Sequence, residues 1–313
     1  MKGALTVGID QYPTSPLRGC VNDATELAKI LESNADGSAN FTVRKAMNVA
    51  SQAGLKELIA ELFEREMDTA LFYFSGHGLQ NETGAYIVTP DHRKNDEGVS
   101  MDEILVLASR SKIRNKIIIL DCCHSGAFGA PQLLGGATAH IGEGMTILTA
   151  SRGSEESIEV NGRGVFTNLL IDALRGGAAD LLGQITPGSV YAYIDQALGP
   201  WDQRPVFKTN VSRFITLRTD KPAVPLNDLK QITVYFPTPD YEFPLAPSYE
   251  FMNKGVANPD HVAIFKNLQK YNRVGLVVPI GEEHMYFAAQ NSKSCRLTAL
   301  GAHYWRLVHK KRI

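Results

Sequence analysis

Two apolar runs that each end in a chemically reactive segment constrain this chain more than any other feature. The first run, Ala70–Phe74, leads into Ser75–Gly78 (Ser-Gly-His-Gly), and the second, Lys116–Leu120, leads into Asp121–Gly126 (Asp-Cys-Cys-His-Ser-Gly). Short apolar runs bounded by glycine and polar residues predict buried strands. In an open parallel sheet, ligands bind outside the carboxyl ends of the strands. We therefore expect both reactive segments at one edge of a parallel sheet.

His77 and Cys123 form a candidate pair of base and nucleophile. The thiolate is the reactive form of cysteine, and a histidine within hydrogen-bond distance can take the thiol proton and later pass one to a leaving amine. The backbone N–H groups of Gly78 and Cys123 are candidates for stabilising an oxyanion, because small residues leave such groups uncovered. The alternative is structural: Cys123 is then a packed thiol, and His77 an ordinary turn residue.

At these residues the chain resembles the caspase-like cysteine peptidases, in particular their metacaspase and bacterial orthocaspase branch. The histidine precedes the cysteine by 46 residues, near the caspase spacing of about fifty. Asp121–Gly126 is similar to the metacaspase motif D-x-C-H-S-G, which identifies Cys123 as the nucleophile and Cys122 as a bystander. The resemblance covers most of the first 220 residues and includes three further segments, Leu17–Ala24, Gly164–Thr167 and Gln203–Phe207.

The resemblance implies a pocket for the residue that precedes the scissile bond, lined by Asp23, Ser75 and Asp121. Two carboxylates favour a cationic side chain, and a planar guanidinium can pair with one of them through two hydrogen bonds. The expected cleavage is therefore after Arg, with Lys second. Each residue also has a structural alternative. Asp23 and Glu26 fit a helix N-terminal capping box, Asp121 fits a polar strand end, and Ser75 fits a turn.

Strand-like and helical patterns alternate over the first 220 residues. They predict a caspase-like three-layer α/β sandwich with a mostly parallel sheet. Strands are expected near residues 4–9, 70–74, 86–88, 116–120, 146–150 and 213–217. Helices are expected near 23–33, 51–66 and 101–110. A further helical face over 166–174 ends at Gly176 and Gly177, and Thr186-Pro187 opens another helix as its cap and first residue.

A second, basic domain is expected over residues 221–313. Net charge changes from −6 over residues 1–220 to +5 over residues 221–313, and the break coincides with a proline-rich passage. Because proline does not sustain a helix, this passage marks a domain boundary. The pattern that follows predicts a small α+β, winged-helix-like domain: a helix over 260–271, strands over 274–280 and 284–289, and a helix over 297–309.

Some bacterial caspase-like proteins that this chain resembles carry an extra module that senses a signal, often in antiphage defence. We therefore expect residues 228–313 to receive an activating signal, either an anionic nucleotide second messenger or a partner protein. The segment Ser125–Ser151 contains no Lys or Arg, so a basic-specific peptidase cannot cleave itself there. The first available sites are Arg152 and Arg163.

Two other functions stay open at this level, a non-catalytic caspase-like scaffold that binds peptides and a nucleic-acid-binding regulator. The final helix offers only Arg306 and the terminal basic cluster, so we expect no nucleic acid as a partner. A protein or peptide substrate is the expected partner.

Composition excludes several classes of protein. With 44% hydrophobic and 21% charged residues, the 313-residue chain is typical of globular proteins. It has no apolar stretch near 18 residues and no leader, so we expect a cytoplasmic protein without a membrane partner. Four cysteines give no disulfide framework and no paired metal motif. The loop Asp91–Glu97 carries carboxylates among cations that would offset a metal ion, so we expect no calcium. We also expect no other metal and no cofactor.

Overall fold

The chain folds into two compact units. The structure is a computed structural model, and it describes residues 1–94, 96–122, 141–150, 159–160, 163–198 and 205–313. The first unit comprises residues 1–179 and 184–221, and the second comprises 180–183 and 222–313. Each unit is described by itself below.

The centre of the first unit is a mostly parallel sheet. Among the described residues six strands form it, in the order β12-β8-β7-β3-β1-β2. All neighbours run parallel except β12, which pairs antiparallel with β8. The strands are β1 (Lys2–Gly8), β2 (Thr42–Met47), β3 (Thr69–Ser75), β7 (Asn115–Asp121), β8 (Met145–Thr149) and β12 (Val206–Asn210).

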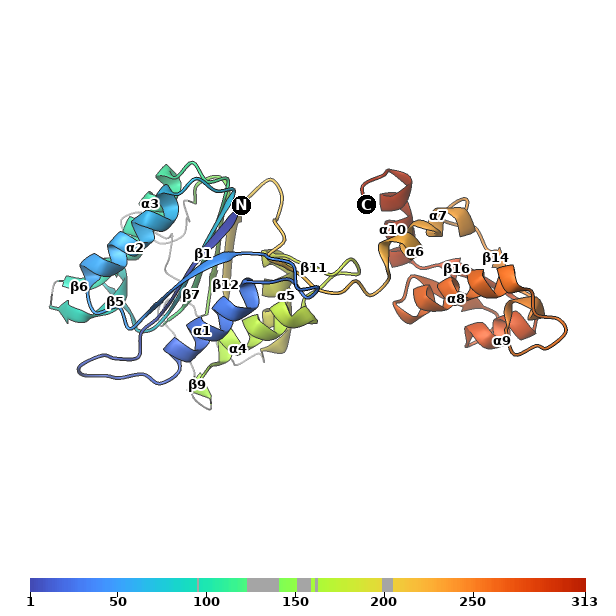
Figure 1. The fold of residues 1–313 in the computed structure, drawn as a ribbon, viewed down its shortest axis with the longest axis horizontal. Helices are drawn as coiled ribbons and strands as arrows, with labels where there is room; N and C mark the ends of the chain where they lie inside the picture. The colour runs from blue at the N-terminus through green and yellow to red at the C-terminus, as the bar shows by residue number, and fades with distance from the viewer. Residues whose placement is uncertain (95, 123–140, 151–158, 161–162, 199–204) are drawn as a thin grey trace. The chain divides into compact units, whose positions relative to one another are not determined.

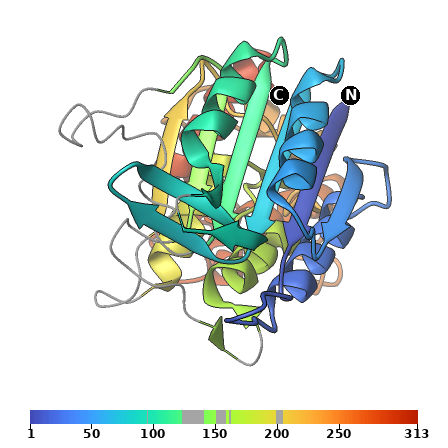
Figure 2. The ribbon, with the colours of Figure 1, turned by 90° about the vertical axis from the view of Figure 1, so that its left-hand side faces the viewer.

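Helices cover both faces of this sheet (Figure 1). One face carries α2 (Gln52–Glu64) and α3 (Met101–Arg110), and Figure 2 views this face directly. The other face carries α1 (Cys20–Leu31), α4 (Val165–Asp172) and α5 (Pro187–Ala197). This arrangement confirms the predicted three-layer α/β sandwich.

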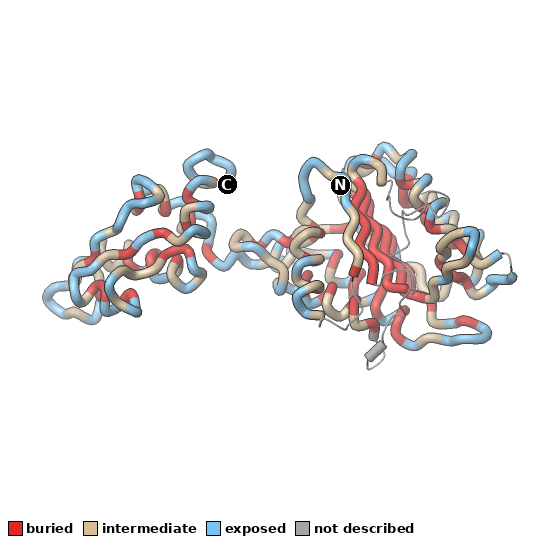
Figure 3. Tube along the Cα trace, turned by 180° about the vertical axis from the view of Figure 1, so that it is seen from behind, coloured by how far each residue is buried: buried red, intermediate tan, exposed pale blue. Residues whose placement is uncertain are grey.

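The central strand β3 is buried along its whole length, and β7 is buried from Lys116 onward (Figure 3). Because successive side chains point to opposite faces of a strand, β3 feeds both cores. Phe72 and Phe74 pack with α2 and α3, whereas Leu71 and Tyr73 pack with α1 and α4. Burial on both faces explains why these strands have nearly continuous apolar sequences, which is typical of parallel sheets.

Two strand predictions differ from the structure. The edge strand β2 was missed because its side chains are half-buried or exposed and include Arg44 and Lys45. The strand expected over 213–217 is wrong, because the chain pairs with β8 earlier, from Val206 to Asn210. After that it leaves the sheet, and the N–H of Leu217 donates to Ile185.

Shorter elements complete the first unit. A small antiparallel sheet contains β4 (Gly78–Asn81), β5 (Gly84–Arg93) and β6 (Asp96–Ser100), and β5 includes the strand predicted over 86–88. Two short pairs join β9 (Glu159–Val160) to β10 (Arg163–Gly164), and β11 (Gln184–Ile185) to β13 (Arg218–Thr219).

The two helix boundaries expected after the nucleophile are confirmed. α4 continues into a wider π-helical turn, η3 (Ala173–Gly177), where Gly176 has a φ of 120°, a backbone conformation that favours glycine. The side chain of Thr186 caps α5 by accepting from the N–H of Ser189, and Pro187 is its first residue.

The second unit combines helices with a small antiparallel sheet. The sheet order is β14-β16-β15. The elements are α6 (Leu226–Lys230), α7 (Ile232–Tyr235), β14 (Phe243–Pro244), η4 (Pro247–Tyr249), α8 (Pro259–Arg273), β15 (Val277–Ile280), α9 (Met285–Gln290), β16 (Ser294–Leu297) and α10 (Ala299–His309).

One element of this unit was predicted wrongly. Residues 284–289 were expected to form the second strand of a wing, but they lie at the start of α9 and within it. The buried side chains of this helix, Met285, Ala288 and Ala289, are spaced by three and four positions, as on one helix face. The strand that pairs with β15 is β16. Among the described residues, no helix is both long and apolar enough to cross a membrane.

Candidate active site

The carboxyl ends of β1, β3 and β7 meet at one edge of the sheet. Ser75, the last residue of β3, lies opposite Asp121, the last residue of β7, and opposite Gly8 at the end of β1. The backbone N–H of Gly76 also donates to the carbonyl of Asp121. The structure therefore brings the segment that contains His77 next to the residues that immediately precede Cys123, as the sequence predicted.

The backbone of His77 is fixed on both sides. Its N–H donates to the hydroxyl of Tyr12 over 3.0 Å, and its carbonyl accepts from the N–H of Val88 over 3.0 Å. Gly76 is required beside it, because a Cβ there would lie 2.6 Å from both the Tyr12 hydroxyl and the Phe74 ring. These contacts fix the backbone position from which the His77 side chain extends.

The imidazole of His77 is oriented by two contacts. Its Nε2 lies 2.7 Å from the carbonyl oxygen of Ser15, and the Tyr12 ring packs edge-on with a centroid distance of 4.5 Å. Because a carbonyl oxygen only accepts hydrogen bonds, Nε2 carries the hydrogen in this contact. In the neutral ring the acceptor nitrogen is then Nδ1, the atom that can take a proton.

Tyr12 is a residue of this site that the sequence did not identify. Besides accepting from His77, its hydroxyl donates to the carbonyl of Val88 over 3.2 Å. The side chain is buried, and this burial is the main reason why its pKa is raised far above the ordinary value. The hydroxyl therefore stays protonated and keeps both hydrogen bonds. An aromatic residue in the otherwise polar segment after β1 was the available signal.

Asp23 and Asp121 border the same glycine. The N–H of Gly164 donates to Oδ2 of Asp23 over 3.0 Å. A Cβ on Gly164 would overlap Oδ2 of Asp121 and lie 3.3 Å from Oδ2 of Asp23. Both carboxylates are buried, with 2% of Asp23 and 5% of Asp121 exposed. Residues that are 98 positions apart in the sequence thus place two carboxyl groups around one backbone segment.

A chain of buried hydrogen bonds extends from Asp121. The Thr167 hydroxyl donates to Oδ2 of Asp121 over 2.6 Å, and the Tyr73 hydroxyl lies 2.6 Å from the same Thr167 oxygen. Because a threonine hydroxyl has one hydrogen, Tyr73 donates to Thr167. The pKa of Tyr73 is raised well above its usual value, chiefly by burial and then by the charges of Asp121 and Asp23.

Ser75 is buried at the base of this group. Only 2% of the residue is exposed, and it is the cross-strand partner of Asp121. Hydrogen bonds with Thr167 and Ser75 oppose the rise in the pKa of Tyr73. The three predicted pocket residues therefore belong to one buried polar cluster.

The alternative role of Asp23 as a helix cap is wrong. The helix α1 begins at Cys20, so Asp23 lies inside its first turn. The carboxylate of Asp10 instead accepts from the N–H groups of Cys20, at 2.9 Å, and Val21, at 3.4 Å. Since Asp10 satisfies the helix start, the Asp23 carboxylate is available to bond across to Gly164.

The structure describes only some of the remaining predicted site residues. Cys123, the expected nucleophile and one of the two expected oxyanion donors, lies outside the described residues, as do His124 and Arg152. Gly78 follows His77 as the first residue of β4. The side chain of Cys122 is fully buried among apolar residues, and buried thiols of this kind are usually unreactive.

The segment Asp91–Glu97, expected to be a loop, lies largely in the ends of β5 and β6, and its first carboxylate has structural partners. Asp91 accepts from the N–H of Gln52 at the start of α2 and from the Thr89 hydroxyl over 2.7 Å. Among the residues that the structure describes, no three His, Cys, Asp or Glu side chains lie close enough together to hold a metal ion.

Comparisons with known proteins find one matching family model and similar solved structures. The family model described as Caspase domain matches residues 1–212. The solved structure of protein GSU0716 from Geobacter sulfurreducens is similar, with a TM-score of 0.52 and 18% identity over 71% of this chain and 98% of that one. Caspase-1 from Spodoptera frugiperda gives a TM-score of 0.48 and 14% identity over 70% of this chain and 90% of that one.

A comparison with curated proteins finds no match. The family model covers well over half of the chain, and its residues include the sheet edge with His77, Asp23 and Asp121. The chain therefore belongs to the caspase-domain family and has the fold of a caspase-like peptidase.

Proposed function

We propose that this protein is a cysteine endopeptidase of the metacaspase and orthocaspase type that cleaves protein substrates after Arg, and after Lys with lower efficiency. The observation that supports the specificity is the placement of the Asp23 and Asp121 carboxylates around Gly164. The same sheet edge carries His77. A cationic side chain that enters here meets two negative charges in a water-poor environment.

The charge of the pocket explains why Arg is preferred to Lys. Two buried carboxylates that share one backbone segment repel each other when both are ionised. A guanidinium beside them offsets this repulsion and offers planar, paired hydrogen bonds to a carboxylate. An ammonium supplies the charge without this geometry. An acidic residue before the scissile bond, as in substrates cut after Asp, would instead add a third negative charge.

The chemistry proposed for the dyad follows from the orientation of His77. Nδ1 takes the proton of the Cys123 thiol, and the thiolate sulfur attacks the carbonyl carbon of the scissile bond. The N–H groups of Gly78 and Cys123 hydrogen-bond to the resulting oxyanion. The protonated imidazole then gives its proton to the leaving amine, which leaves a thioester. Nδ1 next takes a proton from a water whose oxygen attacks the thioester carbon. The C–S bond then breaks, and the proton on Nδ1 returns to the sulfur, which leaves the free thiol and the product acid.

We further propose that the second unit receives a signal that activates the peptidase, in the manner of bacterial antiphage defence. Its net charge of +5 over residues 221–313 suits an anionic nucleotide messenger or an acidic partner protein. The absence of Lys and Arg between Ser125 and Ser151 supports control by such a signal rather than by self-cleavage there. Activity measured with and without a panel of nucleotides tests this part.

The experiment for the peptidase uses fluorogenic peptides that end in Arg, Lys or Asp. Wild-type protein should cleave the Arg peptide fastest, the Lys peptide more slowly, and the Asp peptide not measurably. Cys123→Ala should lower kcat/KM by at least about 1,000-fold, since it removes the nucleophile. The matched control is Cys122→Ala, which should retain activity because this thiol is packed in the core. Preferred cleavage after Asp, or activity that survives in Cys123→Ala, would refute the proposal.

A further inference from the structure

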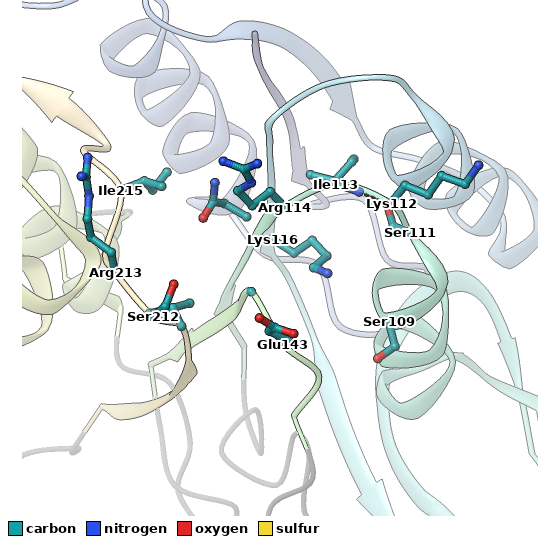
Figure 4. A pocket seen from close by; sticks show the side chains of 13 residues that line it. Ser109, Ser111, Lys112, Ile113, Arg114, Lys116, Glu143, Ser212, Arg213 and Ile215 are labelled. Atoms are coloured by element: carbon teal, nitrogen blue, oxygen red, sulfur yellow. Dashed lines mark hydrogen bonds between the residues drawn. The ribbon is translucent and has the colours of Figure 1, made fainter.

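A second concave site lies at the opposite edge of the sheet from His77. It is a cavity of about 660 Å³ at the amino ends of β7 and β8 and beyond the carboxyl end of β12 (Figure 4). The strand β7 runs from this cavity, at Asn115 and Lys116, to Asp121 at the catalytic edge. At about 3.3 Å per residue, the two sites are roughly 20 Å apart.

The walls of this cavity are strongly cationic. Its described lining residues include four cations, Lys112, Arg114, Lys116 and Arg213, against the single carboxylate of Glu143. In Figure 4, Lys112 and Arg213 lie on opposite sides of the cavity, and Lys116 lies between Arg114 and Glu143. The cations come from the segment before β7 and from the segment after β12, so the fold gathers charge from distant parts of the sequence.

Lys116 is the innermost of these cations, and only 6% of the residue is exposed. Among the described residues, no carboxylate lies within the 4.0 Å of its Nζ that defines an ion pair. Burial lowers the pKa of Lys116, and the charge of Glu143 opposes this shift. The residue is buried while its side chain lines the cavity, and a partly desolvated cation of this kind usually has an anionic partner.

The backbone around Lys116 holds its side chain in place. Its N–H donates to the carbonyl of Gly144 over 2.8 Å. Gly144 has a φ of 76°, and a Cβ there would overlap the carbonyl of Arg114 and lie 3.7 Å from Cε of Lys116. A glycine is therefore required for this close approach, which keeps the lysine stem against the wall of the cavity.

We propose that this cavity binds a small molecule that carries two or more phosphate groups. Phosphates attract both lysine and arginine, and a compact ligand with several of them can contact Lys116 at the bottom and the exposed cations at the rim together. The volume is in the range of small-molecule sites. The cations converge on one cavity, whereas a nucleic-acid surface presents them as an extended stripe or patch. The site is independent of the proposed peptidase activity.

Isothermal titration of the full chain with inorganic tripolyphosphate, pyrophosphate and orthophosphate tests this proposal. Affinity should rise with the number of phosphates and fall as salt is added, because screening weakens the exposed contacts. A parallel titration with ATP distinguishes a nucleotide from free polyphosphate. If ATP binds more tightly than tripolyphosphate, the site fits a nucleotide better. If tripolyphosphate binds more tightly, the site fits free polyphosphate better.

The decisive variants remove single cations. Lys116→Met and the surface variant Arg213→Gln should each weaken tripolyphosphate binding by about 10-fold or more, the usual effect of losing one charge-assisted contact. Lys29→Gln, an exposed change of the same charge on α1, should leave binding unchanged. Since Arg213 is exposed, its variant tests binding without changing a buried residue. No binding of tripolyphosphate at millimolar concentration, or equal binding by all three variants and wild type, overturns the proposal.

Discussion

The hydroxyl of Thr167 donates a 2.6 Å hydrogen bond to Oδ2 of Asp121, and both residues are buried. The helix α4 thereby fixes a carboxylate at the end of β7, next to the proposed nucleophile. Tyr73 in turn donates a hydrogen bond to the Thr167 hydroxyl and helps to orient it. The orientation of the proposed specificity group thus depends on a side chain 46 residues further along the chain.

Replacing Thr167 by Val keeps the shape of the side chain and removes the hydroxyl. Asp121 then loses a donor and Tyr73 loses an acceptor, both in a buried environment. The free energy of unfolding should fall by about 1–3 kcal/mol, as measured by urea denaturation. Thr167→Ser retains the hydroxyl and should remain closer to wild type. An unchanged denaturation midpoint in the Val variant would show that the contact contributes no stability.

Asp121→Asn and Asp23→Asn test the charge of the proposed pocket. Each variant keeps the size of the side chain and removes one negative charge. We expect kcat/KM for the Arg peptide to fall by about 10- to 100-fold in each, the range of one charge-assisted interaction. Glu57→Gln, an exposed change on α2, is the matched control and should have no effect. An equal loss on the Arg peptide and on a neutral peptide would argue against a role in charge recognition.

Tyr12→Phe tests whether this tyrosine positions His77. The variant removes the hydroxyl that accepts from the His77 N–H and donates to Val88, but it keeps the ring that packs on the imidazole. We expect kcat to fall by about 10-fold with KM nearly unchanged, because a small displacement of a catalytic base affects the reaction step most. Tyr86→Phe, which removes a hydroxyl that hydrogen-bonds with Thr83, is the control. A change confined to KM would contradict the positioning role.

The buried Lys116 predicts how stability depends on pH. Its pKa in the folded state is lowered from the ordinary value of 10.5, so between the lowered value and 10.5 the unfolded chain binds more protons than the folded one. The contribution of Lys116 to stability is then unfavourable at low pH and becomes less so as pH rises through this window. Lys116→Met should be more stable than wild type at pH 7, and the difference should shrink toward pH 10.5.

Urea denaturation of both proteins across this pH range measures the effect. The difference between the two proteins removes the contributions of other groups with shifted pKa values, such as Lys2 and Lys208. A variant that is less stable than wild type at pH 7 would show that the ammonium has a favourable partner. Tripolyphosphate should stabilise wild type and reduce the advantage of the variant, since it supplies the missing anion.

The sequence predicted the centre of the first unit well because buried parallel strands have unmistakable apolar runs. The ends of β3 and β7 followed from those runs, and with them the placement of His77 beside Asp121. The edge strand β2 was harder to predict, because half of its surface faces water and its residues are partly charged. The helix α9 was mistaken for a strand, since six mostly apolar residues fit either periodicity.

The contacts within the site depended on tertiary structure that no local pattern encodes. Asp23 and Glu26 match a capping box, yet the helix begins three residues earlier and is capped by Asp10. Only the packing of β10 beside α1 brings Gly164 to the Asp23 carboxylate. The cationic cavity could not be predicted from local sequence either. Arg213 and Lys116 line the same cavity only because β12 pairs with β8.

Gly164 has a consequence for how this protein tolerates mutation. At this position a hydrogen atom stands where any other residue would carry Cβ, and that Cβ would overlap Oδ2 of Asp121. Recognition of charge therefore rests on a position that has no charge and no side chain. Even alanine at this position would displace the Asp121 carboxylate without altering any ionisable group. Sequence surveys that score only ionisable residues would overlook such a variant as a cause of lost activity.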